Sequence, residues 1–247
     1  MESALSVNLI IFLFGTFAAA FVTGLAGFAF GIVAVGIWLH VLPPVQTATL
    51  VVAYALLVQG YAVWKLRHAL KMGRIMPLVI GRAVGIPAGA GLLGWASPAH
   101  LRFAVGVLLV LFSAYNLARP KLPELKQAGR LADGGIGVLN GLLGGSTGLG
   151  GILPTIWCGL RGWTRDEQRA VFQPTAVATF AMTIAWFGGA GLVTADSARL
   201  FAIGLPALVI GTALGWSLYG KLEEASFRKV VLVLLLVSGV VLLVSSR

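Results

Sequence analysis

The sequence predicts an all-α polytopic membrane protein built from two inverted repeats. Each repeat is a glycine-broken helical hairpin plus three transmembrane helices, which makes eight to ten membrane helices. Only 11% of the 247 residues are charged, against about 25% in a typical soluble domain, and 58% are hydrophobic. Long uncharged runs recur along the chain, as in membrane proteins. Two glycine-rich segments, Gly24–Gly31 and Gly141–Gly151, interrupt apolar runs at matching places of the two halves.

The first half begins with an apolar run, Val7–Val41, whose one titratable residue is His40. The run has about 35 residues, whereas a membrane helix needs about 20. We expect Gly24–Gly31 to divide it into two helices of about 15 residues that fold back on each other. A basic loop at 65–74 separates the first two of three further spans, which are Val45–Val63, Met76–Trp95 and Leu101–Leu117.

The second half repeats this scheme after a polar segment. We assign residues 1–118 to the first repeat, 119–132 to a polar cytoplasmic linker and 133–247 to the second repeat. The expected elements of the second repeat are the glycine-broken segment Gly134–Leu160, a charged loop at 161–169, and the spans Ala170–Ala190, Leu200–Tyr219 and Val230–Val244.

A second internal match supports the duplication. At one constant offset, four residues of the first half fall on identical residues of the second: Gly85, Gly89, Gly94 and Arg102 on Gly211, Gly215, Gly220 and Arg228. Two independent matches in the same order indicate an internal repeat.

The distribution of Lys and Arg predicts the topology. The formal net charge is +10, and cytoplasmic loops of membrane proteins carry such an excess, so it does not indicate a nucleic-acid partner. If each broken segment enters the membrane and returns, one side carries fourteen Lys and Arg, and the other carries Arg102, Arg199 and Arg247. Each half then has five elements. An odd number gives the halves opposite orientations and places both termini outside the cytoplasm.

The paired segments Gly24–Gly31 and Gly141–Gly151, together with the glycine-patterned helices Gly85–Gly94 and Gly211–Gly220, resemble the TauE/SafE sulfite exporter family. Pro43 and Pro44 follow the first segment as in that family, whereas residues 164–167 replace the proline pair in the second half. The resemblance implies a transporter of sulfite or organosulfonates that works by alternating access in the cell inner membrane. Its partners would be a small anionic substrate and the lipid bilayer, and a homo-oligomer is left open.

A helix break inside the membrane predicts an anion site. It leaves backbone N–H groups free at a helix N-terminus, where the helix dipole favours negative charge. We expect the two breaks to converge on one anion. The candidate residues are Gly24, Gly27 and Gly31 in the first half and Asn140, Gly141, Gly144, Gly145, Ser146, Thr147 and Gly148 in the second.

Glycines also permit close helix packing. We favour packing for the pairs Gly85/Gly89 and Gly211/Gly215, and an anion site for Gly141–Gly151, where six glycines lie in eleven residues.

Three polar side chains complete the candidate site. Gln46 and Gln173 begin the spans after the hairpins and could donate to an oxyanion, or could instead cap a helix end. Arg82 is the one charged residue well inside a predicted span. It either faces a cavity as the positive charge that attracts the anion, or snorkels to the basic side.

Catalysis, metals and cofactors find no support in the sequence. The three histidines lack metal-ligand spacing, and the single Cys158 is interpreted as a buried apolar side chain. No acidic residue lies deep in a predicted span, so we expect transport without a carboxylate proton relay. The remaining alternatives are a transporter of small carboxylates or other anions and a membrane scaffold.

Overall fold

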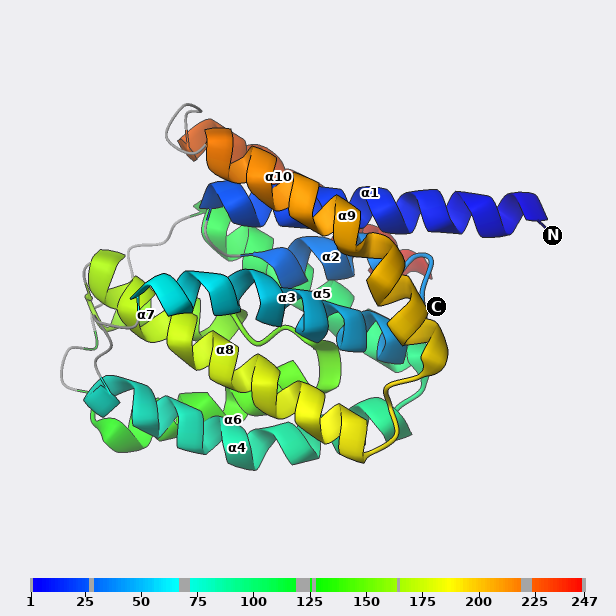
Figure 1. Ribbon diagram of the computed structural model, residues 1–247. Helices are drawn as coiled ribbons and strands as arrows, with labels where there is room; N and C mark the ends of the chain where they lie inside the picture. The colour runs from blue at the N-terminus through cyan, green and yellow to red at the C-terminus, as the bar shows by residue number, and fades with distance from the viewer. Residues whose placement is uncertain are drawn as a thin grey trace. The chain divides into compact units, whose positions relative to one another are not determined.

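The computed structural model describes residues 2–26, 29–66, 72–118, 125, 128–163, 165–218 and 224–245. The regular secondary structure of these residues is α-helical (Figure 1). The helices are α1 (Glu2–Ala26), α2 (Phe30–Trp38), α3 (Pro44–Leu66), α4 (Met72–Trp95), α5 (Pro98–Ala118), α6 (Arg130–Thr147), α7 (Ile152–Leu160), α8 (Arg165–Gly189), α9 (Ala195–Leu218) and α10 (Glu224–Ser245).

Five stretches within the described helices are long and apolar enough to cross a membrane. They are Val7–Leu25, Met72–Trp95, Pro98–Ala118, Ala170–Gly189 and Ala195–Leu218. Two shorter apolar stretches lie in α3 and α10. The prediction of an all-helical, multi-pass membrane protein is thereby confirmed, whereas eight to ten membrane helices in an inverted repeat remain a prediction.

Both glycine-rich segments interrupt a helix, but the pieces are unequal. The first break separates α1, of 25 residues, from α2, of 9, and the second separates α6, of 18, from α7, of 9. The expectation of two pieces of about 15 residues was therefore wrong. A single glycine does not end a helix, and Gly24 lies within α1 because close packing with a neighbouring helix compensates its low helix propensity.

The breaks fall where the backbone becomes left-handed. Gly148 follows α6 with φ 77°, and its N–H bonds the carbonyl of Gly144 at 2.9 Å. Glycine adopts this conformation without the Cβ clash of other residues. Ala29 precedes α2 with φ 88°.

Some segments expected to be loops or linker are helical. α6 begins within the predicted linker, α8 begins within the predicted loop at 161–169, and α10 begins six residues before the predicted span Val230–Val244. In α6 the acidic Asp133 lies in the first turn, where its charge favours the helix dipole.

The chain forms two compact units, and each takes helices from both sequence halves. Unit 1 comprises Met1–Val51, Ala96–Pro120 and Thr194–Arg247. Unit 2 comprises Val52–Trp95 and Lys121–Val193.

In unit 1, α1 packs against α9 and α5 packs against α10. A Cβ added at Gly24 would lie 2.7 Å from the carbonyl oxygen of Thr212 and 2.9 Å from the Cα of Gly215, so the backbones of α1 and α9 touch here. The short helix α2 packs on α1: the Trp38 indole donates to the Phe12 carbonyl at 3.2 Å.

In unit 2, α4 packs along α6 and also contacts α8 (Figure 1). Glycines from both helices line the α4–α6 contact. A Cβ added at Gly85 or Gly89 would collide with the backbone of α6, and one at Gly137 would lie 2.5 Å from the Leu78 carbonyl oxygen. Gly211 and Gly215 make the corresponding contacts between α9 and α1. The packing interpretation of both glycine pairs is confirmed.

Candidate functional site

The break between α6 and α7 is held by its own helix. The side-chain amide of Asn140 donates to the carbonyl oxygen of Gly150 at 3.0 Å, and the N–H of Gly150 bonds the carbonyl of Gly148 at 3.0 Å. Asn140 is fully buried, and its Oδ1 has no hydrogen-bond partner among the described residues. Asn140 thus fixes the loop with its donor and leaves a buried acceptor.

Arg82 of α4 is the unusual residue of unit 2. Its side chain is 0% exposed, and Nη1 donates to the hydroxyl of Thr179 on α8 at 2.7 Å. Nε and Nη2 have no hydrogen-bond partner, and no carboxylate pairs with the guanidinium, among the described residues. Because burying a cation without a negatively charged partner costs free energy, this arrangement favours an anionic ligand.

Thr179 connects Arg82 to the glycine break. Its methyl group lies 3.4 Å from the position that a Cβ on Gly144 would occupy, and 3.2 Å from that of Gly150. On the other side of α6, a Cβ on Gly141 would lie 2.6 Å from the carbonyl oxygen of Arg82. Arg82, Thr179 and the break therefore form one cluster at the junction of α4, α6 and α8.

The two hydroxyls of the second glycine segment donate hydrogen bonds to backbone carbonyls of α6. Ser146 donates to the carbonyl of Leu142 at 2.8 Å, and Thr147 donates to that of Leu143 at 2.7 Å. The oxygen of Thr147 also accepts from the N–H of Leu149 at 3.1 Å. These contacts stabilise the end of α6 and use the hydroxyl hydrogens that would bind an anion.

The other predicted residues of unit 2 divide between packing and polar roles. Gly145 packs on α4, where an added Cβ would lie 2.5 Å from the Ile86 carbonyl oxygen. Gln173 lies in α8 and is 8% exposed as a residue, and its Oε1 has no partner among the described residues.

The first-half candidates belong to unit 1. Gly24 is a packing residue between α1 and α9, Gly31 lies in α2, and Gln46 lies partly buried in the first turns of α3. Gly27 is outside the described residues.

The sequence reasoning missed Thr179. It belongs to a row of threonines at every fourth position of α8, Thr175, Thr179 and Thr183, and all three are 0% exposed. Residues four apart share one face of a helix. A regular row of threonines in an apolar helix was therefore the available signal for a buried polar stripe.

Two acidic side chains of unit 2 already have hydrogen-bond or ionic partners. Asp133, in the first turn of α6, is buried, accepts from the Trp157 indole at 2.7 Å and lies 3.7 Å from Nε of Arg161. Near the start of α4, Arg74 pairs with Glu167 at 2.9 Å. Neither carboxylate pairs with Arg82.

Cys158 is buried with 1% of its surface exposed, as predicted. The described part of the chain holds no group of three His, Cys, Asp or Glu side chains that could bind a metal ion.

The helices and this cluster define a multi-pass membrane protein with a buried, uncompensated arginine beside a helix break. The sulfite exporter TauE/SafE family model matches residues 11–242, so the chain belongs to this family of membrane transporters. The resemblance seen in the glycine segments is thereby confirmed. Comparisons with curated proteins and with solved structures give no match.

Proposed function

We propose that the protein transports small sulfur-containing anions, sulfite or organosulfonates, across the cell inner membrane, and that Arg82 binds the anion. The observation that carries this proposal is the fully buried guanidinium with one hydrogen bond to Thr179 and no carboxylate partner among the described residues. A guanidinium fork matches the oxygens of an oxyanion in geometry and charge.

The surrounding groups suit such a ligand. The end of α6 and the start of α7 meet at residues 148–151, next to Thr179. Free N–H groups at the start of a helix attract anions. Here the nine-residue helix α7 would add its dipole to the charge of Arg82.

Helix pairing supports two inverted repeats, with boundaries at 1–118 and 133–247. The first hairpin helix α1 packs on α9, the fourth helix of the other half, and α6 packs on α4 in the same relation. Both contacts are lined by glycines that approach backbone. Inverted repeats of this kind support alternating access, in which one bundle moves against the other.

A transport assay tests the proposal. We expect proteoliposomes containing the wild-type protein to take up labelled sulfite, with unlabelled methanesulfonate competing and acetate competing weakly. Equal competition by acetate would favour a small-carboxylate transporter, since a guanidinium also pairs with carboxylates. No uptake of either class would favour the scaffold alternative.

The coupling is expected to depend on the anion gradient or the membrane potential, because Asp133 is occupied by Trp157 and Arg161. Uptake that follows an imposed proton gradient, and loses this dependence in Asp133→Asn, would contradict this part of the proposal.

A further inference from the structure

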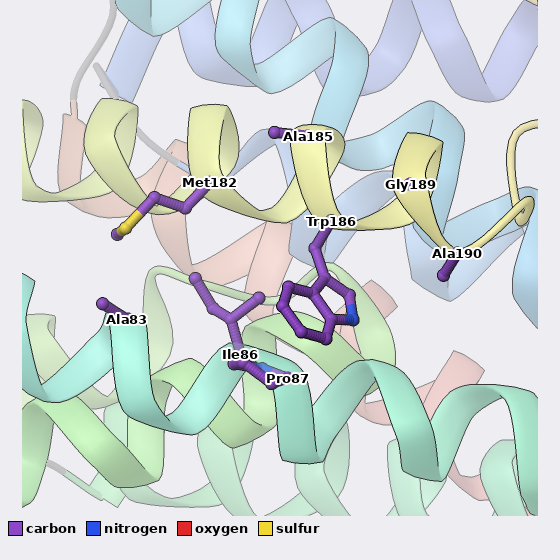
Figure 2. Close-up of a pocket in the computed structure, with 8 residues that line it drawn as sticks. All are labelled: Ala83, Ile86, Pro87, Met182, Ala185, Trp186, Gly189 and Ala190. Carbon is purple, nitrogen blue, oxygen red and sulfur yellow. The ribbon is translucent and has the colours of Figure 1, made fainter.

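An apolar cleft of about 610 Å³ lies between α4 and α8 in unit 2. Its walls include Ala83, Ile86 and Pro87 of α4 and Met182, Ala185 and Trp186 of α8. Figure 2 shows the side chains of Ile86 and Trp186 pointing toward one another in the space between the two helices. No lining side chain carries a charge, and the volume lies in the range of small-molecule sites.

The cleft lies along the same two helices as the Arg82–Thr179 hydrogen bond, and its lining on α4 begins at the residue after Arg82. Ala83 directly follows Arg82, and Ile86 is one turn further along the same face of α4. On α8, Met182 and Trp186 follow Thr179 in the sequence. Figure 2 shows that the path from Met182 to Trp186 along α8 runs in the same direction as the path from Ala83 to Pro87 along α4. The α4–α8 contact is therefore cationic at the Arg82–Thr179 hydrogen bond and apolar beyond it.

A second polar group lies between these two ends. Thr183 is one turn beyond Thr179 on the same face of α8, is 0% exposed, and has a hydroxyl without a partner among the described residues. The contact thus offers the unpaired Nε and Nη2 of Arg82 and an unpaired hydroxyl, followed by a space that suits hydrocarbon.

Building on the function proposed above, we propose that this cleft takes the hydrocarbon part of an organic sulfonate whose sulfonate group is bound at Arg82. The complementarity is of charge at one end and of apolar surface at the other. The cleft then determines specificity: it favours sulfonates that carry a short alkyl chain over inorganic sulfite.

Chain-length dependence of binding tests this inference. We expect the Kd of the purified protein, measured by calorimetry, to fall from methanesulfonate through propanesulfonate to hexanesulfonate by about fourfold for each methylene that becomes buried. Ala83→Phe places an aromatic ring in the cleft and should flatten this series. Ala88→Phe is the matched control, because Ala88 is an exposed residue of α4 outside the cleft lining, and its series should keep the wild-type slope.

A second variant on the opposite wall, Ala185→Leu, should also reduce the slope. Equal affinity for the three sulfonates, or a slope that neither Ala83→Phe nor Ala185→Leu changes, would overturn the inference and leave sulfite transport standing. Hexylammonium binding as tightly as hexanesulfonate would identify a site for lipid chains and would also overturn it. Failure of every sulfonate and of sulfite to bind the wild type would instead overturn the proposed function itself.

Discussion

Arg82 carries a fully buried guanidinium, on which the proposed anion site depends. The sequence singled out Arg82 because it lies inside an apolar span, yet left open whether it snorkels to the surface or faces a cavity. Its side chain is 0% exposed and bonds Thr179, so it does not extend to the surface. The burial depends on contacts between helices far apart in sequence, which no local pattern contains.

Thr179 is expected to position Arg82 for the anion. Thr179→Val keeps the shape of the side chain but removes the acceptor of the Arg82 hydrogen bond. We expect sulfite to bind about tenfold more weakly, since a hydrogen bond to a charged group contributes about 1.5–3 kcal/mol. Calorimetric titration of the purified variant measures the change.

The matched control is Thr175→Val, one turn earlier on the same buried stripe, where the hydroxyl bonds the α8 backbone rather than Arg82. If both variants lose affinity equally, Thr179 has only a general role in the stability of α8.

The hydroxyls of the α6–α7 segment make backbone hydrogen bonds, and their role in anion binding stays a prediction. Ser146 and Thr147 were predicted to donate to an anion, and the structure has them donating to the carbonyls of Leu142 and Leu143. Serine and threonine in helices commonly bond the preceding turn, and sequence alone does not distinguish that role from ligand binding.

Among the helices, α6 has glycines with different roles on two of its faces, one toward α4 and one toward the break. Gly141 and Gly145 let the backbone of α4 approach, whereas Gly144 faces Gly150 and Thr179 at the break. The number of glycines predicted the break. The orientation of α6 determines which of its glycines contact α4 and which lie at the break. This orientation depends on the helices that pack against α6.

The close contact between α4 and α6 predicts that a larger residue at Gly145 lowers the stability of the protein. In Gly145→Ala the new methyl group would lie 2.5 Å from the Ile86 carbonyl oxygen, so α4 and α6 must separate. We expect a destabilisation of about 1–3 kcal/mol, as for other overpacked cores. The midpoint of thermal unfolding in detergent measures it.

Gly91→Ala is the matched control in α4, because no atom lies within 4 Å of the added Cβ. It should be neutral or stabilising by up to about 1 kcal/mol, through helix propensity. Equal destabilisation by both substitutions would contradict the close-approach explanation.

The break itself predicts a loss of transport. Leucine at Gly148 must adopt the left-handed backbone, and leucine at Gly144 must fit beside the Cα of Gly150, 3.4 Å from the added Cβ. We expect Gly144→Leu and Gly148→Leu to abolish sulfite uptake by proteoliposomes while most of the protein still inserts into the membrane. Gly91→Leu, at an open position of α4, serves as control. If Gly144→Leu and Gly148→Leu took up sulfite at the wild-type rate, the proposed anion site at the α6–α7 break would be refuted.

Helix existence was easier to predict than helix ends. The apolar runs indicated six helices within six residues of their observed bounds, namely α3, α4, α5, α8, α9 and α10. The predicted lengths of α1 and α2 were wrong, because a glycine-rich stretch of sequence does not indicate the residue at which the helix ends. The left-handed residues at Ala29 and Gly148 decide this.

At the scale of the whole molecule, the compact units do not coincide with the sequence halves. The internal match indicated a duplication, but α4 packs on α6 and α9 on α1, so each half supplies a helix to the other half's hairpin. An internal sequence repeat does not indicate whether a hairpin helix packs against a helix of its own half or of the other half. The family, by contrast, was recognisable from the glycine segments, because their spacing is local to the chain.

Topology provides a prediction for the whole chain. With Cys158 replaced by serine, single cysteines introduced at Gly73 and Gly129 should react with a membrane-impermeant maleimide only from the cytoplasmic side. Cysteines at Ser97 and Ala195 should react only from the opposite side, because the positive-inside rule predicts that the basic loops are cytoplasmic. All four positions are exposed. Labelling of Gly73→Cys and Ser97→Cys from the same side would contradict the five-element inverted repeat.

Sulfite binding by two arginine variants of α4 shows whether Arg82 binds the anion. Arg82→Gln and Arg74→Gln remove the same charge from the same helix, but Arg74 is 39% exposed and pairs with Glu167. We expect Arg82→Gln to raise the calorimetric Kd for sulfite by about 30-fold or more, and Arg74→Gln to stay within about threefold of the wild type. A wild-type Kd in Arg82→Gln would contradict the account.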